Sequence, residues 1–138
     1  MGYYVILQES TARIPADKLD EALTRLKALN HKPGVEKRGG SYGPNGKTES
    51  WFSWMDPNYD QTVTSAADVF RMVGFDVTES PEGLTLDYYD NKTGQEQLFI
   101  DEVADLFTQE SYMTWRGEEG EFWQWTPQGT KQGKVTFE

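Results

Sequence analysis

SYMTWRGEEGEFWQWT, residues 111–126, contains the clearest structural signal in this sequence. Two aromatic-rich runs flank Gly117-Glu118-Glu119-Gly120, and this pattern predicts a β-hairpin. Glycine reaches positive φ without a Cβ clash, so we expect a three-residue turn with Gly120 in the left-handed conformation.

That turn sets the register of the two predicted strands. It pairs Trp115 with Trp123 and Met113 with Trp125, and residues that oppose each other across an antiparallel pair share a face. Because side chains alternate along a strand, the opposite face is expected to carry Thr114, Arg116, Phe122 and Gln124. The rest of the chain must then cover the aromatic face.

Aromatic and β-branched composition predicts five further strands. They are Tyr3–Glu9, Glu49–Met55, Phe75–Glu79, Leu84–Asp90 and Lys131–Glu138. The first opens with a nearly continuous apolar run, which favours a central strand covered on both faces. The second has aromatic residues on both faces and is also expected in the interior. The fourth is expected to place Leu84, Leu86 and Tyr88 on one face, opposite Thr85, Asp87 and Tyr89.

Apolar residues recur at helical spacing in three segments. The segments are Ala16–Asn30, a helix that begins between Asp60 and Ser65 and ends at Val73, and a helix that begins at Thr93 and ends near Thr108. Pro15 favours the start of the first, and Gly74 suits the end of the second. The third starts with the capping-box pattern T-x-x-E, in which Glu96 is the last residue.

Residues 31–48, HKPGVEKRGGSYGPNGKT, have loop composition throughout and include four Lys or Arg. We expect a flexible, basic, glycine-rich loop. Gly46-Lys47-Thr48 resembles the end of a phosphate-binding loop, but that motif requires glycine where this chain has Ser41. The only histidine, His31, is expected to cap the preceding helix, since a cationic imidazole suits the end of the helix dipole.

These elements predict a single domain, residues 1–138, with the order β-α-β-α-β-β-α-β-β-β. Hairpins dominate this order, so the predicted class is α+β, with a mainly antiparallel sheet and three helices packed on it.

The residues that carry common catalytic chemistry are scarce. The chain has no cysteine, one histidine and no G-x-S-x-G motif, which leaves almost no residues for Ser-His or Cys-His nucleophilic arrangements. Asp87 and Asp90 are better explained as solvated strand residues than as an acid/base or calcium site. We therefore predict a non-enzymatic protein without a cofactor or metal site.

No signal-peptide pattern and no run of about 20 apolar residues is present, so we expect a cytoplasmic protein without membrane association.

The net charge of −10 is unevenly distributed. Residues 1–50 carry eight Lys or Arg and six Asp or Glu, whereas residues 51–138 carry five and seventeen. Because affinity for phosphates comes largely from Lys and Arg, direct nucleic-acid binding is not expected. The simplest interpretation of the charge is solubility.

The third predicted helix has no Lys or Arg, and its exposed side is expected to carry Glu96, Asp101, Glu102 and Asp105. Carboxylates one turn apart repel each other, so this face is expected to destabilise the helix, and the helix sequence shows no compensating cation. Such positions are candidates for function, although a solvated helix face is the simpler alternative.

Three segments resemble small acidic proteins encoded by bacteriophages of actinobacteria. They are Trp51–Asp56, Tyr89–Glu96, and Trp115–Glu121 together with Trp123 and Trp125. That group has no assigned activity, so the resemblance transfers no site residues. It implies a protein that acts in the host cytoplasm during infection or from a prophage.

The leading hypothesis is an inhibitor that binds a basic host protein, such as a nuclease or another nucleic-acid-handling defence protein, in the manner of anti-CRISPR or anti-restriction proteins. Its acidic surface would imitate a polyanion and occupy a basic groove. The predicted partner-binding residues are Asp101, Glu102, Asp105, Glu110, Glu118, Glu119 and Glu121.

Two alternatives remain open. One is a small-ligand or nucleotide-binding module that uses the basic loop, including Lys37 and Arg38. The other is a structural or assembly protein that associates through exposed hairpin aromatics. The sequence leaves the oligomeric state open.

Overall fold

The computed structural model describes residues 3–134, without the side chains at positions 42, 47, 48 and 132–134. The strands in that range are β1 (Tyr4–Ser10), β2 (Arg13–Pro15), β3 (Gly39–Gly43), β4 (Gly46–Trp51), β5 (Asp76–Ser80), β6 (Gly83–Tyr88), β7 (Asp90–Lys92), β8 (Met113–Gly117), β9 (Glu121–Thr126) and β10 (Gly129–Lys134). The helices are α1 (Leu19–Leu29), α2 (Tyr59–Thr62), α3 (Ala66–Val73) and α4 (Glu96–Glu102), with 3-10 turns at Ala16–Lys18 and Ala104–Leu106.

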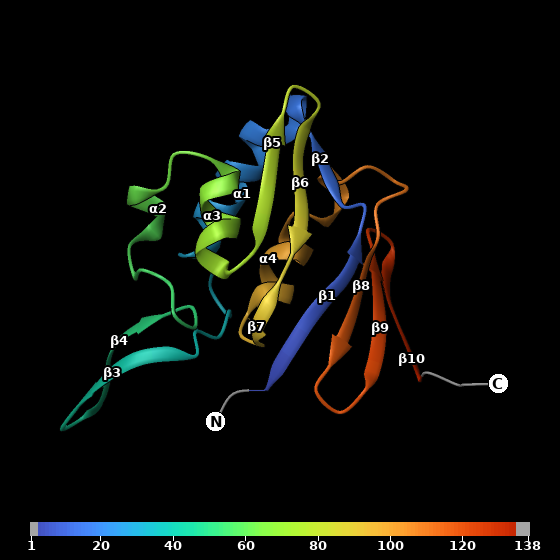
Figure 1. Ribbon diagram of the computed structural model, residues 1–138. Helices are drawn as coiled ribbons and strands as arrows, with labels where there is room; N and C mark the ends of the chain where they lie inside the picture. Colours follow the sequence, from blue (N-terminus) through green and yellow to red (C-terminus); the bar gives the residue numbers. More distant parts are fainter. Residues whose placement is uncertain (1–2, 135–138) are drawn as a thin grey trace.

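The strands form three antiparallel groups with the orders β10-β9-β8-β1-β7, β2-β6-β5 and β3-β4. Two backbone hydrogen bonds join the first two groups, from Leu7 N to Tyr89 O at 2.8 Å and from Leu86 N to Ala12 O at 3.1 Å. The result is one bent antiparallel layer from β5 to β10. Figure 1 shows α1 and α4 behind this layer and α3 beside β5. The predicted α+β class is confirmed.

The β8–β9 hairpin has the predicted register. Trp115 opposes Trp123 and Met113 opposes Trp125, and Gly120 has a φ of +86°. Of these four apolar side chains, Met113, Trp115 and Trp125 are buried, and Trp123 packs partly buried against them. Trp115 contacts the rings of Phe75 and Tyr89, so the hairpin closes the core as expected.

Strand β1 has the predicted central position, between β7 and β8. Only one of its faces is fully covered, because Val5 and Leu7 are buried whereas Tyr4 is exposed and Ile6 is half-buried. The prediction of burial on both faces is therefore wrong. The predicted last strand, 131–138, overlaps β10 through Lys134, and its remaining residues lie outside the described range.

The loop predicted at 31–48 is wrong in its second half, because β3 and β4 form an antiparallel hairpin there. Glycine is rare in strands, so the glycines at both ends of β3 led the composition to predict a loop. This hairpin projects away from the main layer in Figure 1. The strand expected over 49–55 ends at Trp51. Among the described strands β4 pairs with β3 alone, so the prediction of an interior strand is also wrong. The flexibility of residues 31–48 stays a prediction.

The second predicted helix is divided into α2 and α3. Ser65 Oγ accepts a hydrogen bond from Asp68 N, and Asp68 Oδ2 accepts one from Thr64 N. This reciprocal capping fixes the start of α3 at Ala66 and prevents a continuous helix from α2. The predicted end is confirmed, with Gly74 at a φ of +129°.

The third predicted helix is shorter than its pattern indicated. Helix α4 begins at Glu96 and ends at Glu102, and a 3-10 turn follows at Ala104–Leu106. Thr93 does not cap the helix. Its hydroxyl donates to Glu96 Oε2 at 2.6 Å, so the two residues form a local contact before the helix begins. Glu96 is 7% exposed, which contradicts its predicted place on the exposed face.

Candidate protein-binding surface

Two carboxylates, Glu102 at the end of α4 and Asp105 in the turn after it, have cationic partners that the helix sequence did not reveal. Arg25 Nη1 in α1 donates to Asp105 Oδ1 at 2.6 Å, and Lys32 Nζ donates to Glu102 Oε1 at 3.0 Å. The hydrogen bond from Arg25 lowers the pKa of Asp105. The expectation that this face is repulsive and lacks compensating cations is therefore wrong, because Arg25 of α1 and Lys32 after it supply them.

Asp101 joins α4 to the hairpin. Its Oδ1 accepts hydrogen bonds from Trp125 Nε1 at 3.1 Å and from Gln97 Nε2 at 2.9 Å. Asp101, Glu102 and Asp105 thus each hold two parts of the fold together. The ion pairs of Glu102 and Asp105 reduce the charge that these two residues can offer to a partner, whereas the partners of Asp101 are neutral.

The other four predicted residues lie outside this network. Glu110 is exposed in the segment before β8, and Glu118 and Glu119 are exposed in the turn between β8 and β9. Glu121 is half-buried. Its Oε1 packs against Gly117, and a Cβ atom added to Gly117 would lie 1.7 Å from that oxygen.

Two contacts with the start of β1 fix the turn of the hairpin. Tyr4 N donates to Glu118 Oε1, and Glu119 N donates to Tyr3 Oη at 3.1 Å. Within the turn, Gly120 N donates to Gly117 O at 3.1 Å. We name residues 118–121 with Tyr3 and Tyr4 the hairpin tip. Its backbone is held at Glu119 N and Gly120 N, and the Glu118 carboxylate accepts the hydrogen bond from Tyr4 N. Glu118 and Glu119 remain exposed.

The structure separates the predicted acidic residues into two groups. Trp125, which binds Asp101, lies four residues along β9 from Glu121, or about 13 Å at the usual strand rise. The α4 carboxylates and the hairpin tip are therefore at opposite ends of the hairpin. The tip carboxylates form no ion pair with a described residue, in contrast to Glu102 and Asp105.

The large exposed aromatic and apolar side chains lie at positions that the sequence pattern did not select. Among the described residues they are Tyr4 (44% exposed), Trp54 (45%) and Tyr88 (41%). Tyr88 was expected to share the face of Leu84 and Leu86, but the chain bends between β6 and β7 and buries Tyr89 instead. The hairpin aromatics are mostly packed, so association through them has less support.

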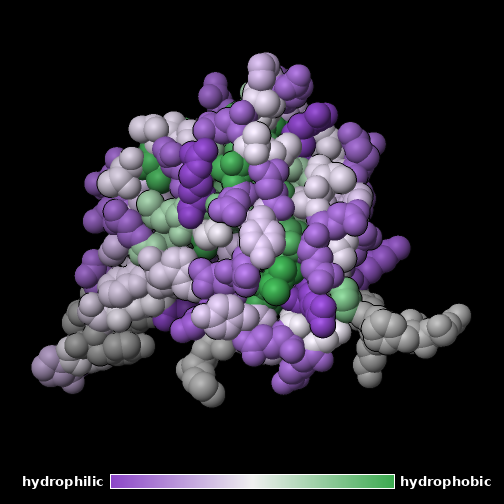
Figure 2. All heavy atoms as spheres, in the orientation of Figure 1, coloured by the Kyte–Doolittle hydropathy of each residue, from purple (hydrophilic) through white to green (hydrophobic). Residues whose placement is uncertain are grey.

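Figure 2 shows that the face seen in Figure 1 is mostly hydrophilic, and hydrophobic residues reach it only in small areas. One cation on the hairpin, Arg116, lies over the Phe122 ring, with its Cζ 5.8 Å from the ring centroid. This contact fits the predicted placement of both residues on the outer face. Tyr4, at the hairpin tip, combines an exposed aromatic ring with nearby carboxylates.

The basic loop takes part in packing. Lys37 Nζ donates to Asn30 O at 2.8 Å and lies 5.2 Å from the centroid of the Phe52 ring. Arg38 Nη1 donates to Gly94 O at 3.2 Å. Beside them is an open groove of about 330 Å³, lined by Gly34, Val35, Glu36, Arg38, Gly94, Gln95, Gln97 and Leu98.

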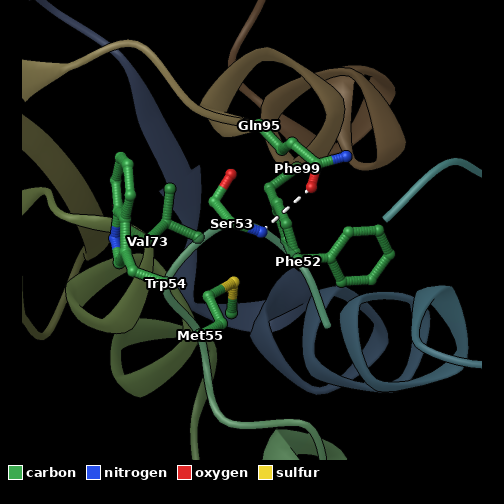
Figure 3. A pocket seen from close by; sticks show the side chains of 7 residues that line it. All are labelled: Phe52, Ser53, Trp54, Met55, Val73, Gln95 and Phe99. Atoms are coloured by element: carbon green, nitrogen blue, oxygen red, sulfur yellow. Dashed lines mark hydrogen bonds between the residues drawn. The ribbon is translucent and has the colours of Figure 1, made fainter. Parts of the chain in front are cut away.

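A smaller cavity of about 10 Å³ lies where the chain turns after β4, between Phe52, Met55, Val73 and Phe99 (Figure 3). That volume is near the minimum for one water molecule, so the cavity is a packing feature. The Gln95 side chain fixes this turn, because its Oε1 accepts from Ser53 N at 3.1 Å and from Arg38 N at 3.2 Å.

The described residues contain no group of three or more His, Asp or Glu side chains arranged to hold a metal ion. The single histidine is engaged with a carboxylate, since His31 Nε2 lies 2.8 Å from Asp60 Oδ2. Within the described part of the chain, no helix is both long and apolar enough to cross a membrane.

Comparison with protein-family models, curated proteins and solved structures gives no match. The functional assignment therefore depends on the contacts, exposure and charge of this chain.

Proposed function

We propose that the protein is a non-enzymatic inhibitor that binds a basic host protein through the hairpin tip, in the cytoplasm of a phage-infected cell. The partner class is a nuclease or another nucleic-acid-handling defence protein, whose basic groove would receive the acidic tip in place of a polyanion. The observation that carries the proposal is a turn backbone fixed at Glu119 N and Gly120 N, with exposed Glu118 and Glu119 that form no ion pair with a described residue. The Glu118 carboxylate is itself oriented by the hydrogen bond from Tyr4 N.

Physical properties of the tip support this assignment. A backbone held by Tyr3 and Gly117, with the Glu118 side chain held by Tyr4 N, loses little conformational freedom on binding, which lowers the cost of association. The exposed charges of Glu118 and Glu119 speed the approach of a basic partner to the tip by steering. Tyr4, whose backbone N binds Glu118, has an exposed ring that adds contact area of the kind enriched at protein interfaces.

The test is capture of partner proteins from host lysate with three forms of the protein. The wild type should retain a nucleic-acid-binding protein at low salt and lose most of it at high salt, because exposed charge pairs are screened. Glu118→Lys/Glu119→Lys should abolish retention. Asp17→Lys/Glu49→Lys changes the total charge equally at other exposed positions and should retain the partner. Equal retention by the first two forms would refute binding through the tip.

A second candidate function is small-ligand binding in the groove beside the basic loop. Its volume of about 330 Å³ lies at the lower end of the range for ligand pockets, and Arg38 lines it. A nucleotide ligand would raise the melting temperature of the wild type, and Arg38→Ala would remove the rise. No shift with a nucleotide panel would exclude this candidate for nucleotides.

A further inference from the structure

A second groove, of about 210 Å³, lies between α1, the start of α3 and the β5–β6 pair. Apolar residues from three elements line it, namely Leu19 and Leu23 of α1, Ala66 and Ala67 of α3, and Leu84 of β6. Drug-sized ligands usually occupy 300–1,000 Å³. The groove is below that range, and its size is closer to that of one long side chain than of a cofactor.

Two carboxylates also line the groove. Asp20 is exposed and forms no ion pair with a described residue. Glu79 accepts a hydrogen bond from Arg71 Nη2 at 3.0 Å, so its charge is partly compensated. The groove therefore combines an apolar floor with net negative charge, and this combination is complementary to a long cationic side chain.

An anionic occupant is disfavoured because the start of α3 already has its own carboxylate. Asp68 Oδ2 accepts hydrogen bonds from Thr64 N at 3.0 Å and from Thr64 Oγ1 at 2.9 Å. These bonds lower the pKa of Asp68, with the backbone bond as the largest cause. A second anion beside Asp68, Asp20 and Glu79 would meet repulsion.

We propose that this groove receives an arginine side chain from a basic partner segment, with the aliphatic stem on Leu19 and Leu23 and the guanidinium at Asp20. Arginine is favoured over lysine because its guanidinium is more weakly hydrated and binds carboxylates through a planar fork of donors. The inference rests on the proposed function in that both require a basic partner, but it adds an anchoring site remote from the hairpin tip. Figure 1 shows the β5–β6 turn and the β8–β9 turn at opposite ends of the layer.

The test is a titration of isotopically labelled protein with hexaarginine amide, followed by amide chemical shifts at low salt. Saturable shifts are expected at Thr64–Ala67 and at Asp20, with weaker binding of hexalysine amide. Asp20→Lys should weaken hexaarginine binding at the groove about tenfold or more, because like charges would meet there. Asp17→Lys, an equal charge change at a residue that does not line the groove, should leave the affinity within about twofold of the wild type.

A variant that fills the groove tests whether hexaarginine binding depends on the shape of the groove and not only on its charge. Thr64 is exposed and lines the groove, so Thr64→Trp should block hexaarginine without changing the net charge. Equal binding by wild type, Asp20→Lys and Thr64→Trp would overturn the proposal. Shifts confined to Tyr3, Tyr4 and residues 117–121 would refute the groove and leave the hairpin tip as the binding site. No shifts anywhere with hexaarginine would count against both the groove and the proposed function.

Discussion

Arg25 in α1 and Asp105 after α4 lie 80 residues apart in sequence, and Arg25 Nη1 donates to Asp105 Oδ1 at 2.6 Å. Lys32 and Glu102 form a parallel contact at 3.0 Å. The positive excess of residues 1–50 is thus partly used to neutralise carboxylates of residues 51–138. The basic residues 1–50 and the acidic residues 51–138 therefore do not form two separate surfaces. Which carboxylates remain without a cationic partner can be read only from the contacts in the structure.

The Arg25–Asp105 pair predicts a pH-dependent contribution to stability. The hydrogen bond from Arg25 lowers the pKa of Asp105 below its ordinary value of 3.8. A group with a depressed pKa in the folded state stabilises the fold above its unfolded-state pKa, and this contribution disappears as the pH falls through the folded-state pKa. Asp105→Asn should therefore lower the melting temperature at pH 7, by the equivalent of about 0.2–1 kcal/mol for an exposed pair.

The difference in melting temperature between wild type and Asp105→Asn should shrink as the pH falls below 3.8. Asp17→Asn provides the control, because Asp17 is exposed and has no ion pair with a described residue. A difference for Asp105→Asn that stayed constant from pH 7 to pH 2 would show that the ion pair does not contribute.

The left-handed turn residue gives a second prediction. Gly120 has a φ of +86°, and no atom lies within 4 Å of where its Cβ would be. Gly120→Ala should thus cost only the backbone strain of an L-residue, about 1–2 kcal/mol in the free energy of unfolding. Gly120→Asn should cost less, because asparagine tolerates this conformation better. Urea unfolding measures both, and an alanine variant as stable as wild type would contradict the turn geometry.

The tryptophans differ sharply in their expected contributions to stability. Trp115 is 1% exposed and contacts Phe75 and Tyr89, so Trp115→Ala should destabilise the fold by about 3–5 kcal/mol. Trp54 is exposed and donates one hydrogen bond to Val73 O, so Trp54→Ala should cost about 1 kcal/mol. Similar losses in urea unfolding monitored by circular dichroism would contradict the assigned core.

Sequence patterns over a few neighbouring residues predicted those parts of the fold that depend on local contacts. The β8–β9 register followed from one glycine turn and the alternation of tryptophans, and Ala16–Asn30 gave α1 through its apolar stripe. The first residues of α3 could have been found from Ser65 and Asp68, which have the spacing of a capping pair.

Features that depend on distant contacts could not be predicted in this way. The partners of Glu102 and Asp105 come from the first 32 residues, and no pattern in α4 indicates them. The bend between β6 and β7 exchanges the faces of Tyr88 and Tyr89, since a shift of one residue reverses the side of every following side chain. Of the seven predicted acidic residues, only Glu118 and Glu119 joined the candidate site as exposed carboxylates on a fixed backbone.

The central claim is that the hairpin tip steers and binds a basic partner. The most direct measurement is the association rate constant of the captured partner at two salt concentrations, for wild type, Glu118→Lys/Glu119→Lys and Asp17→Lys/Glu49→Lys. Reversal of the tip charges should slow association about tenfold or more at low salt, and the control should change it far less. An association rate that is equal for all three forms, or that does not fall with salt, would contradict the claim.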